Sequence, residues 1–272
     1  MIKTKCKSCN ASGGVSQIDV SSETDTYLDY LKMNYSGLKR EYIKCNNCGL
    51  IYRTIIMDEM EKELLYKHFR DESLRNETKE EYFERITSLP IEDSENYDKC
   101  QFLKRYIKND ANNKILDIGC GAGVFLYAFK NIFDKWNTIG VEPTKDFSDI
   151  AKDKVIHILN EYLDENTFDY TFDLISMNHV LEHLDDYFDM LNMLKKYMSK
   201  DSLLYIEVPS DKDIGFLDNS HDRFMCQHDV IFSQEVLNEM AKKAGYEIIV
   251  NENFISKRKR NNIRLLLKKR LL

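Results

Sequence analysis

Proline and long apolar runs are scarce in this chain of 272 residues, which contains only three prolines and ten glycines. These counts exclude collagen-like and proline-rich low-complexity chains. All apolar runs are far shorter than the roughly 18 residues that a membrane-spanning helix needs. The first residues also lack the apolar core of a secretory signal peptide. We therefore expect a cytoplasmic protein, and 43% hydrophobic with 31% charged residues predicts a folded globular one.

Basic residues are scarce outside one end of the chain. Residues 255–272 contain eight of the 39 lysines and arginines and no acidic residue. The rest of the chain therefore has 31 basic against 46 acidic residues, a formal net charge of −15. A body with this charge repels phosphate backbones, which argues against a nucleic-acid partner.

The basic end, residues 251–272, combines lysines and arginines with leucines and predicts an amphipathic tail. Such a tail is compatible with three roles: a helix on an anionic membrane surface, a nucleic-acid contact, or a solvated terminal helix. In the first role, residues 255–272 would make peripheral contact with the inner face of the membrane.

Cysteine is present in an odd number, seven, and only four of the seven form close pairs. The pairs are Cys6/Cys9 and Cys45/Cys48, whereas Cys100, Cys120 and Cys226 are isolated. A secreted disulfide framework normally uses an even set of cysteines. Two C-x-x-C pairs without an export signal are typical of a closed four-cysteine zinc site, although a redox pair or chance spacing are alternatives. We therefore predict a structural zinc ion in a zinc-ribbon-like domain over residues 1–57.

Apolar periodicity divides the remainder into a helical linker or lid over residues 58–110 and a domain over residues 111–250. The second part alternates short apolar strands with helical periods. Strands are predicted at residues 114–118, 138–141, 155–159, 172–177, 203–208 and 246–250, and helices at residues 124–133, 145–154, 186–198 and 233–244. This alternation predicts an α/β fold with a mostly parallel sheet and helices on both faces. Ligands bind such sheets at the carboxyl ends of the strands.

A glycine-rich turn follows the first of these strands. Asp117, Gly119, Gly121 and Gly123 stand at alternate positions, so the spacing differs from the dinucleotide fingerprint G-x-G-x-x-G. Glycine is needed where φ is positive or where a ligand approaches the backbone closely, although such a turn can also serve packing alone. Glu142 ends the second strand, where an acid can accept two hydrogen bonds from ribose hydroxyls. A solvated strand end is the alternative for Glu142.

Three further segments follow this turn: Val141-Glu142-Pro143, Phe172-Asp173-Leu174-Ile175 and Leu181-Glu182-His183-Leu184. In this order, the set resembles the motifs of class I S-adenosylmethionine-dependent methyltransferases. The resemblance covers about residues 111–250 and implies a Rossmann-like sheet that binds S-adenosylmethionine. This ligand carries an ammonium and a sulfonium but no phosphate, so a carboxylate near the turn suits it. The resemblance implies cofactor contacts by Asp117, Gly119, Gly121, Gly123, Glu142 and Asn178, with Asp117 close to the methionine part.

The residues after the fourth predicted strand include two histidines and a glutamate. His179-x-x-Glu182-His183 matches an inverted zinc-peptidase pattern. We reject that interpretation because the pattern needs one helix with both histidines on one face, whereas here it follows a strand end. In the resembled family, a Leu-Glu-His segment at this place lies next to the cofactor and the acceptor. His183 is therefore a candidate catalytic residue, and a purely structural hydrogen-bonding role is the alternative.

Residues 221–233 are similar to the acceptor segment of sugar methyltransferases that bear an N-terminal zinc domain. C-methylating members have a Tyr-x-Glu-His cluster, at whose positions this chain has Met225, Gln227 and His228. Because the tyrosine and the glutamate are absent, we favour O-methylation, with His228 as a base whose pKa lies near 7. The alternative is that His228 only shapes the loop. The same resemblance implies that the zinc domain supplies part of the acceptor pocket.

The predicted function is therefore an S-adenosylmethionine-dependent methyltransferase that O-methylates a sugar, in a nucleotide-linked or surface-glycan precursor. Small hydroxylated metabolites such as quinone precursors are also compatible acceptors. One alternative is an RNA methyltransferase, since some of these carry four-cysteine zinc modules. A second is a non-catalytic adaptor that binds proteins through its zinc domain, against which the intact glycine turn argues.

Overall fold

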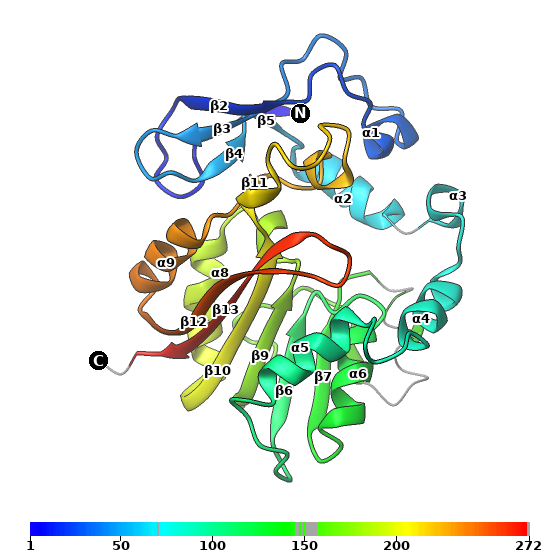
Figure 1. The fold of residues 1–272 in the computed structure, drawn as a ribbon, viewed down its shortest axis with the longest axis vertical. Coiled ribbons are helices and arrows are strands. Elements are labelled where there is room, and N and C mark those ends of the chain that lie inside the picture. The colour runs from blue at the N-terminus through cyan, green and yellow to red at the C-terminus, as the bar shows by residue number, and fades with distance from the viewer. Residues whose placement is uncertain (70, 145–146, 148, 151–156, 271–272) are drawn as a thin grey trace.

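The computed structural model describes residues 1–69, 71–144, 147, 149–150 and 157–270. Its larger sheet has seven strands in the order β12-β13-β10-β9-β6-β7-β8 and lies below a smaller sheet in Figure 1. The strands of the larger sheet are β6 (Lys114–Ile118), β7 (Asn137–Val141), β8 (His157–Leu159), β9 (Phe172–Asn178), β10 (Met198–Pro209), β12 (Tyr246–Ile255) and β13 (Asn261–Lys269).

The central strands of this sheet are rich in apolar residues because both of their faces are covered. β6 pairs in parallel with β7 and with β9, and β9 pairs in parallel with β10. β7 also pairs in parallel with β8, at one edge of the sheet. At the other edge, β13 runs antiparallel between β10 and β12. The predicted α/β fold with a mostly parallel sheet is confirmed.

Helices cover the two faces of the larger sheet. The helices are α5 (Glu95–Leu103), α6 (Val124–Ile132), α8 (Tyr187–Leu194) and α9 (Gln234–Lys243). α5 and α6 share a core with Ile115 and Leu174, whereas α8 and α9 share a core with Leu116 and Ile175. Successive residues of a strand point to opposite faces of the sheet, so Ile115 and Leu116 belong to different cores, as do Leu174 and Ile175.

The N-terminal part forms a small module above the larger sheet (Figure 1). Its elements are β1 (Ile2–Lys3), β2 (Gly14–Asp19), α1 (Thr26–Tyr30), β3 (Glu41–Cys45), β4 (Ile51–Arg53) and β5 (Ile55–Ile56). β2, β3 and β4 form a four-stranded sheet with β11 (Val230–Ile231), which comes from far along the chain. Cys6, Leu50 and Tyr52 of the module share one core with Leu116 of the larger sheet. The two parts are therefore packed into one hydrophobic interior.

Three further helices connect the small module to α5. They are α2 (Glu59–His68), α3 (Glu72–Arg75) and α4 (Lys79–Thr87). α2 begins at a capping box formed by Asp58 and Glu61, and α4 begins at one formed by Thr78 and Glu81. Pro90 lies between α4 and α5, and a proline inside a helix would remove a backbone hydrogen bond, so it separates the two helices.

The predicted amphipathic tail is wrong. Residues 261–269 form β13, and the basic run from Lys257 to Arg260 forms the turn that joins β12 to β13. Ile263 and Leu265 of this strand are buried, and β13 lies between β10 and β12. In the turn, Arg258 pairs with Glu95 and Arg260 pairs with Asp222. A short run of leucines is compatible with a buried strand as well as with a helix. Here it forms a strand because β10 and β12 pair with it on both sides. Peripheral membrane contact through residues 255–272 loses its basis, since it required that helix.

Two other predictions fall partly on residues outside the described ranges. The predicted helix at residues 145–154 lies largely outside them, as do the last two residues of the basic end. The predicted strand at residues 155–159 is observed as β8, over its described part. Within the described ranges, no helix is long and apolar enough to cross a membrane.

Candidate functional site

The glycine turn after β6 leaves its backbone open on one side. Gly119, Gly121 and Gly123 all have positive φ, and Gly123 is the residue from which α6 starts. A Cβ atom on Gly119 would lie 2.7 Å from a methyl carbon of Val180, so only glycine fits there. A Cβ atom on Gly121 would meet no heavy atom within 4 Å. The turn therefore combines one tight contact with one free face at which a ligand can approach the backbone.

Asp117 lies at the base of this turn, and only 2% of it is exposed. Its Oδ1 accepts hydrogen bonds from Ser176 Oγ at 2.6 Å and from Asn178 Nδ2 at 3.0 Å. Burial raises the pKa of this carboxyl to about 7, although both hydrogen bonds favour the charged form. The structure thus brings Asp117 and Asn178 together, and the buried Oδ1 of Asn178 accepts no hydrogen bond from the described residues.

Glu142 closes the turn from the end of β7. Its Oε2 accepts a hydrogen bond from the backbone N–H of Gly121 at 2.9 Å, and its Oε1 accepts one from Thr144 N–H at 2.9 Å. A carboxylate has about four acceptor positions, and the described residues use two of them, which leaves two for a ligand hydroxyl as far as these residues are concerned. The three features predicted for a cofactor site therefore lie at one edge of the sheet: the glycine turn, Asp117 and Glu142.

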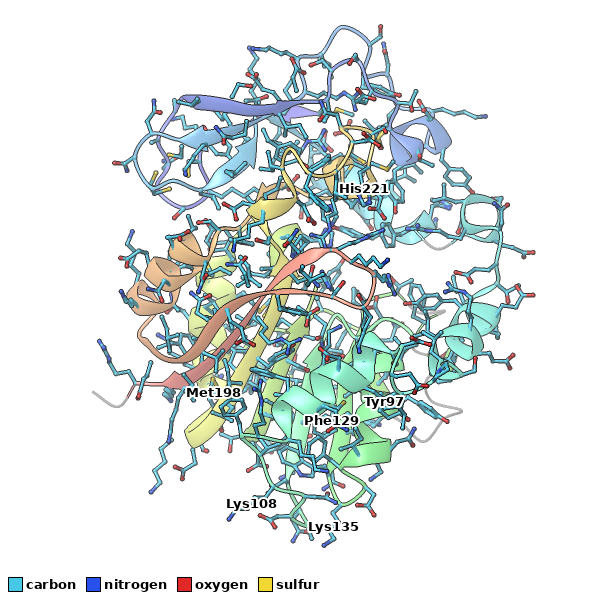
Figure 2. All side chains as sticks on the ribbon, viewed as in Figure 1. Tyr97, Lys108, Phe129, Lys135, Met198 and His221 are labelled. Atoms are coloured by element: carbon cyan, nitrogen blue, oxygen red, sulfur yellow. The ribbon has the colours of Figure 1, made fainter. Side chains whose placement is uncertain are left out.

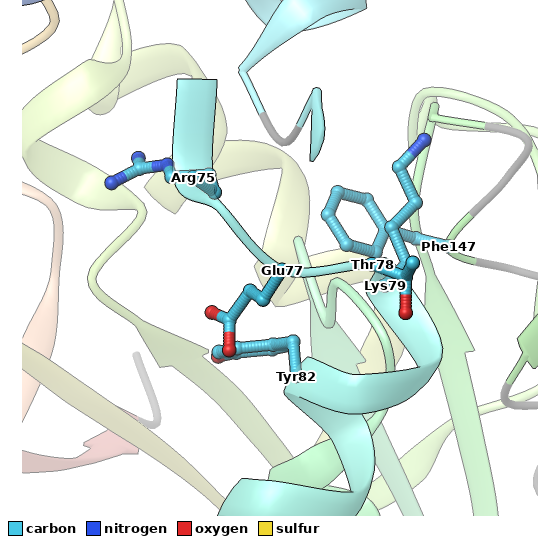
Figure 3. Close-up of a pocket in the computed structure, with 6 residues that line it drawn as sticks. All are labelled: Arg75, Glu77, Thr78, Lys79, Tyr82 and Phe147. Carbon is cyan, nitrogen blue, oxygen red and sulfur yellow. The ribbon is translucent and has the colours of Figure 1, made fainter. Parts of the chain in front are cut away.

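Helix α4 covers the side of the turn where α6 begins. Phe83 of α4 packs with Ala122 and Phe147, and its ring contacts Tyr127 edge to face at 5.5 Å. A small hollow lies beside this contact, and Figure 3 shows its lining. It is lined by Arg75, Glu77, Thr78, Lys79, Tyr82 and Phe147. Part of the helical stretch at residues 58–110 therefore lies against the glycine turn.

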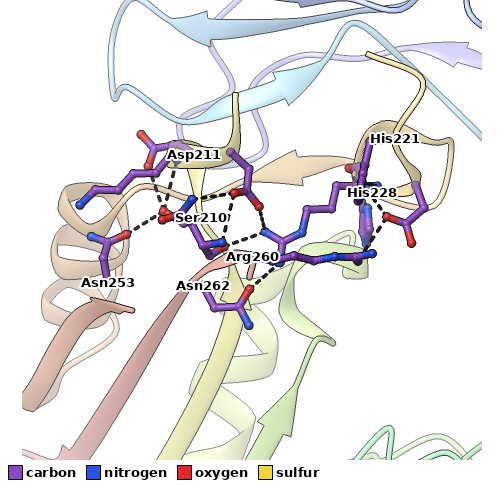
Figure 4. Close-up of polar contacts among 12 residues, drawn as sticks. Ser210, Asp211, His221, His228, Asn253, Arg260 and Asn262 are labelled. Carbon is purple, nitrogen blue, oxygen red and sulfur yellow. Dashed lines mark hydrogen bonds and ion pairs between the residues drawn. The ribbon is translucent and has the colours of Figure 1, made fainter. Parts of the chain in front are cut away.

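The loop that carries His228 is fixed to both parts of the molecule. His228 O accepts a hydrogen bond from Tyr42 OH at 2.6 Å, and Asp229 O accepts one from Arg53 N–H at 3.0 Å, both from the small module. On the other side, the Arg223 guanidinium pairs with Asp213 and donates to Asn262 (Figure 4). The small module thus positions the loop on which His228 lies, at the carboxyl side of β10.

His183 and His228 stack on each other. Their ring centroids are 4.8 Å apart and their planes differ by 30°. Nδ1 of His183 is 2.6 Å from Gln227 O, and Nδ1 of His228 is 2.8 Å from Arg223 O. Carbonyl oxygens only accept hydrogen bonds, so each Nδ1 is the protonated nitrogen of its ring.

The pKa of His228 differs from the value near 7 that was expected of a base. Burial, and then the adjacent His183, lowers the pKa of His228 to about 3. The ring is therefore neutral at physiological pH, with its lone pair on Nε2. His221, by contrast, lies between the small module and the larger sheet in Figure 2, and its Nδ1 accepts a hydrogen bond from Arg223 N–H at 3.2 Å. His221 thus caps a short turn, whereas His183 and His228 face each other.

A buried charge network around Glu207 was not predicted from the sequence. Glu207 of β10 accepts hydrogen bonds from Tyr205 OH at 2.7 Å and Asn262 Nδ2 at 3.0 Å, and it pairs with Lys99 at 3.4 Å. Although burial opposes its charge, Lys99 and then His179 hold the pKa of Glu207 well below its usual range. No short motif marks these residues, because α5 and β10 meet only in the folded chain.

His179 connects this network to Glu182. It has a φ of 55°, rare for a residue with a side chain. Its ring nitrogens lie 3.4 Å from Glu182 Oε1 and 3.4 Å from Glu207 Oε1. Burial opposes its charge, but the two carboxylates outweigh that effect and raise the pKa of His179 to about 8. His179 therefore lies between two acids and pairs with both of them.

The four paired cysteines lie close together in the small module. Cys6 Sγ is 3.4 Å from Cys48 Sγ, and Cys9 Sγ is 3.6 Å from Cys45 Sγ. One sulfur from each cysteine lies within 4.8 Å of the others. Four thiolates around a zinc ion at about 2.3 Å are separated by about 3.8 Å, so these residues fit a tetrahedral metal site. All four positions are filled by protein, as in structural zinc sites.

Comparison with known proteins gives a match over much of the chain. A family model described as a methyltransferase domain matches residues 92–251. An uncharacterized methyltransferase of Schizosaccharomyces pombe is 29% identical over 109 residues, which cover 35% of this chain and 38% of that protein. A tRNA U34 carboxymethyltransferase of Campylobacter lari is 25% identical over 129 residues, 44% of each chain. The chain thus spans less than half the length of these curated relatives.

Solved structures share the fold of the larger domain. Magnesium protoporphyrin IX methyltransferase of Synechocystis, solved with bound S-adenosylhomocysteine (SAH), has a TM-score of 0.55 and 13% identity. The match covers 76% of this chain and 99% of that one. At this level of identity, the likeness concerns the arrangement of helices and strands.

Proposed function

Because this chain belongs to the methyltransferase domain family, we propose that it is an S-adenosylmethionine-dependent methyltransferase that acts on a sugar hydroxyl. The observation that carries the proposal is the edge where a free glycine turn meets two carboxylates. Asp117 lies near the carboxyl end of β6, and Glu142, just after β7, accepts a hydrogen bond from the backbone N–H of Gly121. This is the edge at which α/β sheets bind their ligands.

The residues present fit the cofactor in three respects. The free side of Gly121 admits a ligand close to the backbone. Glu142 keeps two acceptor positions that the described residues leave open, which suits the ribose hydroxyls. The carboxylate of Asp117 suits an ammonium group, as does Oδ1 of Asn178, which accepts no hydrogen bond from the residues that the structure describes. When bound, S-adenosylmethionine supplies a methyl group that its sulfonium already activates.

On the acceptor side, the chain needs to hold a hydroxyl in line and to take up its proton. In our proposal, Nε2 of neutral His228 accepts the hydrogen bond of the acceptor hydroxyl. The hydroxyl oxygen forms the new bond to the methyl carbon as the sulfur–carbon bond breaks, and the proton moves to Nε2. Glu182, which is buried nearby and favours a positive His228, would stabilise the imidazolium. A pKa of about 3 makes His228 a weak base without that help.

The second candidate acceptor is RNA, because one relative is a tRNA U34 carboxymethyltransferase. The expectation that a nucleic-acid partner is unlikely is therefore not supported. Residues 1–254 carry a net negative charge and would repel a polyanion such as RNA, which still argues for a small acceptor. The alternative of an adaptor without catalysis predicts that SAH does not bind.

The test is a transfer assay with S-adenosylmethionine labelled on its methyl group and a lysate of the source cell. Label in small, nuclease-resistant anionic molecules or in glycan would support the sugar acceptor. Label in nuclease-sensitive polymer would replace it with RNA. Absence of SAH binding by calorimetry would contradict methyl transfer of either kind.

A further inference from the structure

The turn between β12 and β13 is basic, whereas most of the molecule is acidic. Its four residues, Lys257 to Arg260, are all lysines or arginines. Residues 1–254, by contrast, contain 31 basic and 46 acidic residues, a formal net charge of −15. Like charges in succession repel one another and together attract anions. The turn is therefore a local positive surface on a negative body.

Acids of the protein pair with only two of these four cations. The arginines of the turn lie 3.0 Å from Glu95 and 3.3 Å from Asp222. Lys257 and Lys259 are exposed and form no ion pair with a residue that the structure describes. Their two ammonium groups can therefore pair with an anion that comes from outside the protein.

The backbone of the turn is fixed by two hydrogen bonds. Ser256 N–H donates to Arg260 O at 2.8 Å, and Lys259 N–H donates to Ser256 O at 2.8 Å. Lys259 has a positive φ of 58°, which is uncommon for a residue with a side chain. Because the turn is already formed, an anion can bind it without first ordering the backbone, which favours affinity.

The turn lies at the edge of the sheet that carries the proposed cofactor residues. Asn178, Glu207 and Arg264 pair in register across β9, β10 and β13. β13 runs antiparallel to β10, and Asn261, its first residue, accepts a hydrogen bond from Ser210 N–H beyond the end of β10. The turn that precedes β13 therefore lies past the carboxyl end of β10, on the same side as Asn178.

Arg260 connects the turn to the segment that carries the proposed base. Figure 4 shows its side chain extending from the turn toward His221 and His228. Its ion-pair partner, Asp222, precedes Arg223, whose carbonyl oxygen lies 2.8 Å from Nδ1 of His228. A group bound at the turn would therefore lie close to the acceptor side of the proposed site.

We propose that the basic turn, Lys257 to Arg260, binds the phosphate groups of the acceptor, which is then a sugar linked to a nucleoside diphosphate. This inference rests on the proposed sugar acceptor and narrows it from any sugar to one that carries phosphate. Lysine binds phosphate as a point charge, and arginine can bind two phosphate oxygens at once. In this arrangement, the sugar lies between the turn and Nε2 of His228.

The size of the positive surface favours a short anion over a long one. The turn contributes four cations, and Glu95 and Asp222 beside it are acidic. A diphosphate can remain within such a surface. An RNA backbone would extend beyond it onto the acidic body, where like charges repel it.

The test titrates the full-length, zinc-loaded protein with UDP in a calorimeter. We expect saturable binding that weakens as salt is added, because exposed charges are screened. Lys257→Gln combined with Lys259→Gln removes two charges and keeps polar side chains. This turn variant should bind UDP about tenfold more weakly, and its binding should depend less on salt. Uridine, which has no phosphate, should bind both proteins equally and more weakly than UDP binds the wild type.

The matched control is Lys108→Gln combined with Lys135→Gln. Figure 2 shows these lysines together at the opposite end of the molecule from the small module, and both are exposed. The control removes the same charge and should bind UDP like the wild type. SAH has no phosphate, so its affinity should be equal in all three proteins and reports whether the cofactor edge is intact.

Failure of this inference can be told apart from failure of the proposed function. With SAH binding intact, the inference is overturned by absence of saturable UDP binding, by equal affinity for UDP and uridine, or by equal UDP affinity in the turn variant and the wild type. Absence of SAH binding by the wild type would contradict the proposed function itself, and the inference with it. A single-stranded RNA oligonucleotide that binds more tightly than UDP, and does so through the same lysines, would replace the nucleotide-linked sugar with RNA.

Discussion

At the scale of single residues, Asp117 combines a buried position with a proposed role as a negative charge. Its carboxylate accepts hydrogen bonds from Ser176 and Asn178, yet burial raises its pKa to about 7. Protonation would therefore neutralise it just below physiological pH. Only the ionised form attracts the ammonium of the proposed cofactor.

We predict that SAH affinity increases with pH up to about 7 and levels off above it. Below the raised pKa of Asp117, binding must first remove a proton, so affinity should fall about tenfold per pH unit. Asp117→Asn cannot ionise and should bind weakly at every pH. Calorimetric titration with SAH across this range measures both effects.

The control for this substitution is Asp173→Asn, at the opposite end of β9. Asp173 accepts a hydrogen bond from Lys114 N–H at 2.7 Å and lies away from the glycine turn. Its loss should leave SAH affinity and its pH dependence unchanged. A wild-type affinity that stays constant through pH 7 would contradict the role given to Asp117.

The residues of the site differ in how far the sequence could predict them. Asp117, Gly121 and Glu142 were predicted because each has a fixed place in a local pattern at or just after the end of a predicted strand. Glu207 and Lys99 were missed, since their pairing joins β10 to α5 and no local pattern marks it. The low pKa of His228 also depends on burial and on a ring from another segment, which no spacing reveals.

At the scale of elements, β13 shows why the basic end was misassigned. Its apolar residues Ile263, Leu265, Leu266 and Leu267 are interrupted only by Arg264, so the run is too short and too continuous to separate a strand from a buried helix by its period. The strand exists because β10 on one side and β12 on the other supply its hydrogen bonds. The strands β6 and β9, with turn signals at their ends, were predicted within a residue of their bounds.

We predict that Leu265→Ala lowers the free energy of unfolding by about 2–5 kcal/mol. Leu265 is fully buried on β13 opposite Ile206, so its truncation leaves a cavity in the core of the sheet. Urea denaturation followed by circular dichroism measures the change. On a solvated terminal helix, the same substitution would change stability by only about 0.5 kcal/mol.

Arg258→Ala, in the turn between β12 and β13, is the control for this substitution. Its guanidinium pairs with Glu95 at 3.0 Å on the protein surface. Exposed ion pairs contribute about 1 kcal/mol or less, so stability should change little. Equal losses in the two variants would mean that β13 is not part of the core.

At the scale of the whole molecule, the cysteine module and the larger sheet cannot be treated as independent parts. Cys6, Cys45 and Tyr52 share a core with Leu116 and Leu237. Lys7 and Lys62 also pair with both Asp185 and Asp229 across the junction, at 2.5–2.8 Å. Loss of the metal should therefore lower the stability of the larger sheet as well as that of the module.

We predict about one zinc ion per chain at the four cysteines and its loss in Cys45→Ser. The melting temperature of the whole chain should fall in a single transition, because structural zinc contributes directly to folding. Elemental analysis and calorimetry measure the two effects. Cys100→Ser, at a buried cysteine of α5 outside the cluster, should keep its zinc. Zinc-free protein as isolated, or Cys45→Ser with its zinc retained, would contradict the site.

The pairing of β11 with β4 has a consequence for synthesis on the ribosome. Val230 and Ile231 complete a sheet whose other strands all precede residue 54. Until they emerge, β4 is an edge strand with open backbone groups that could pair with another nascent chain. Zinc would then be the main restraint on the module while most of the protein is still being translated. The same late segment brings His228, so closure of that edge and assembly of the proposed acceptor side would occur in one step.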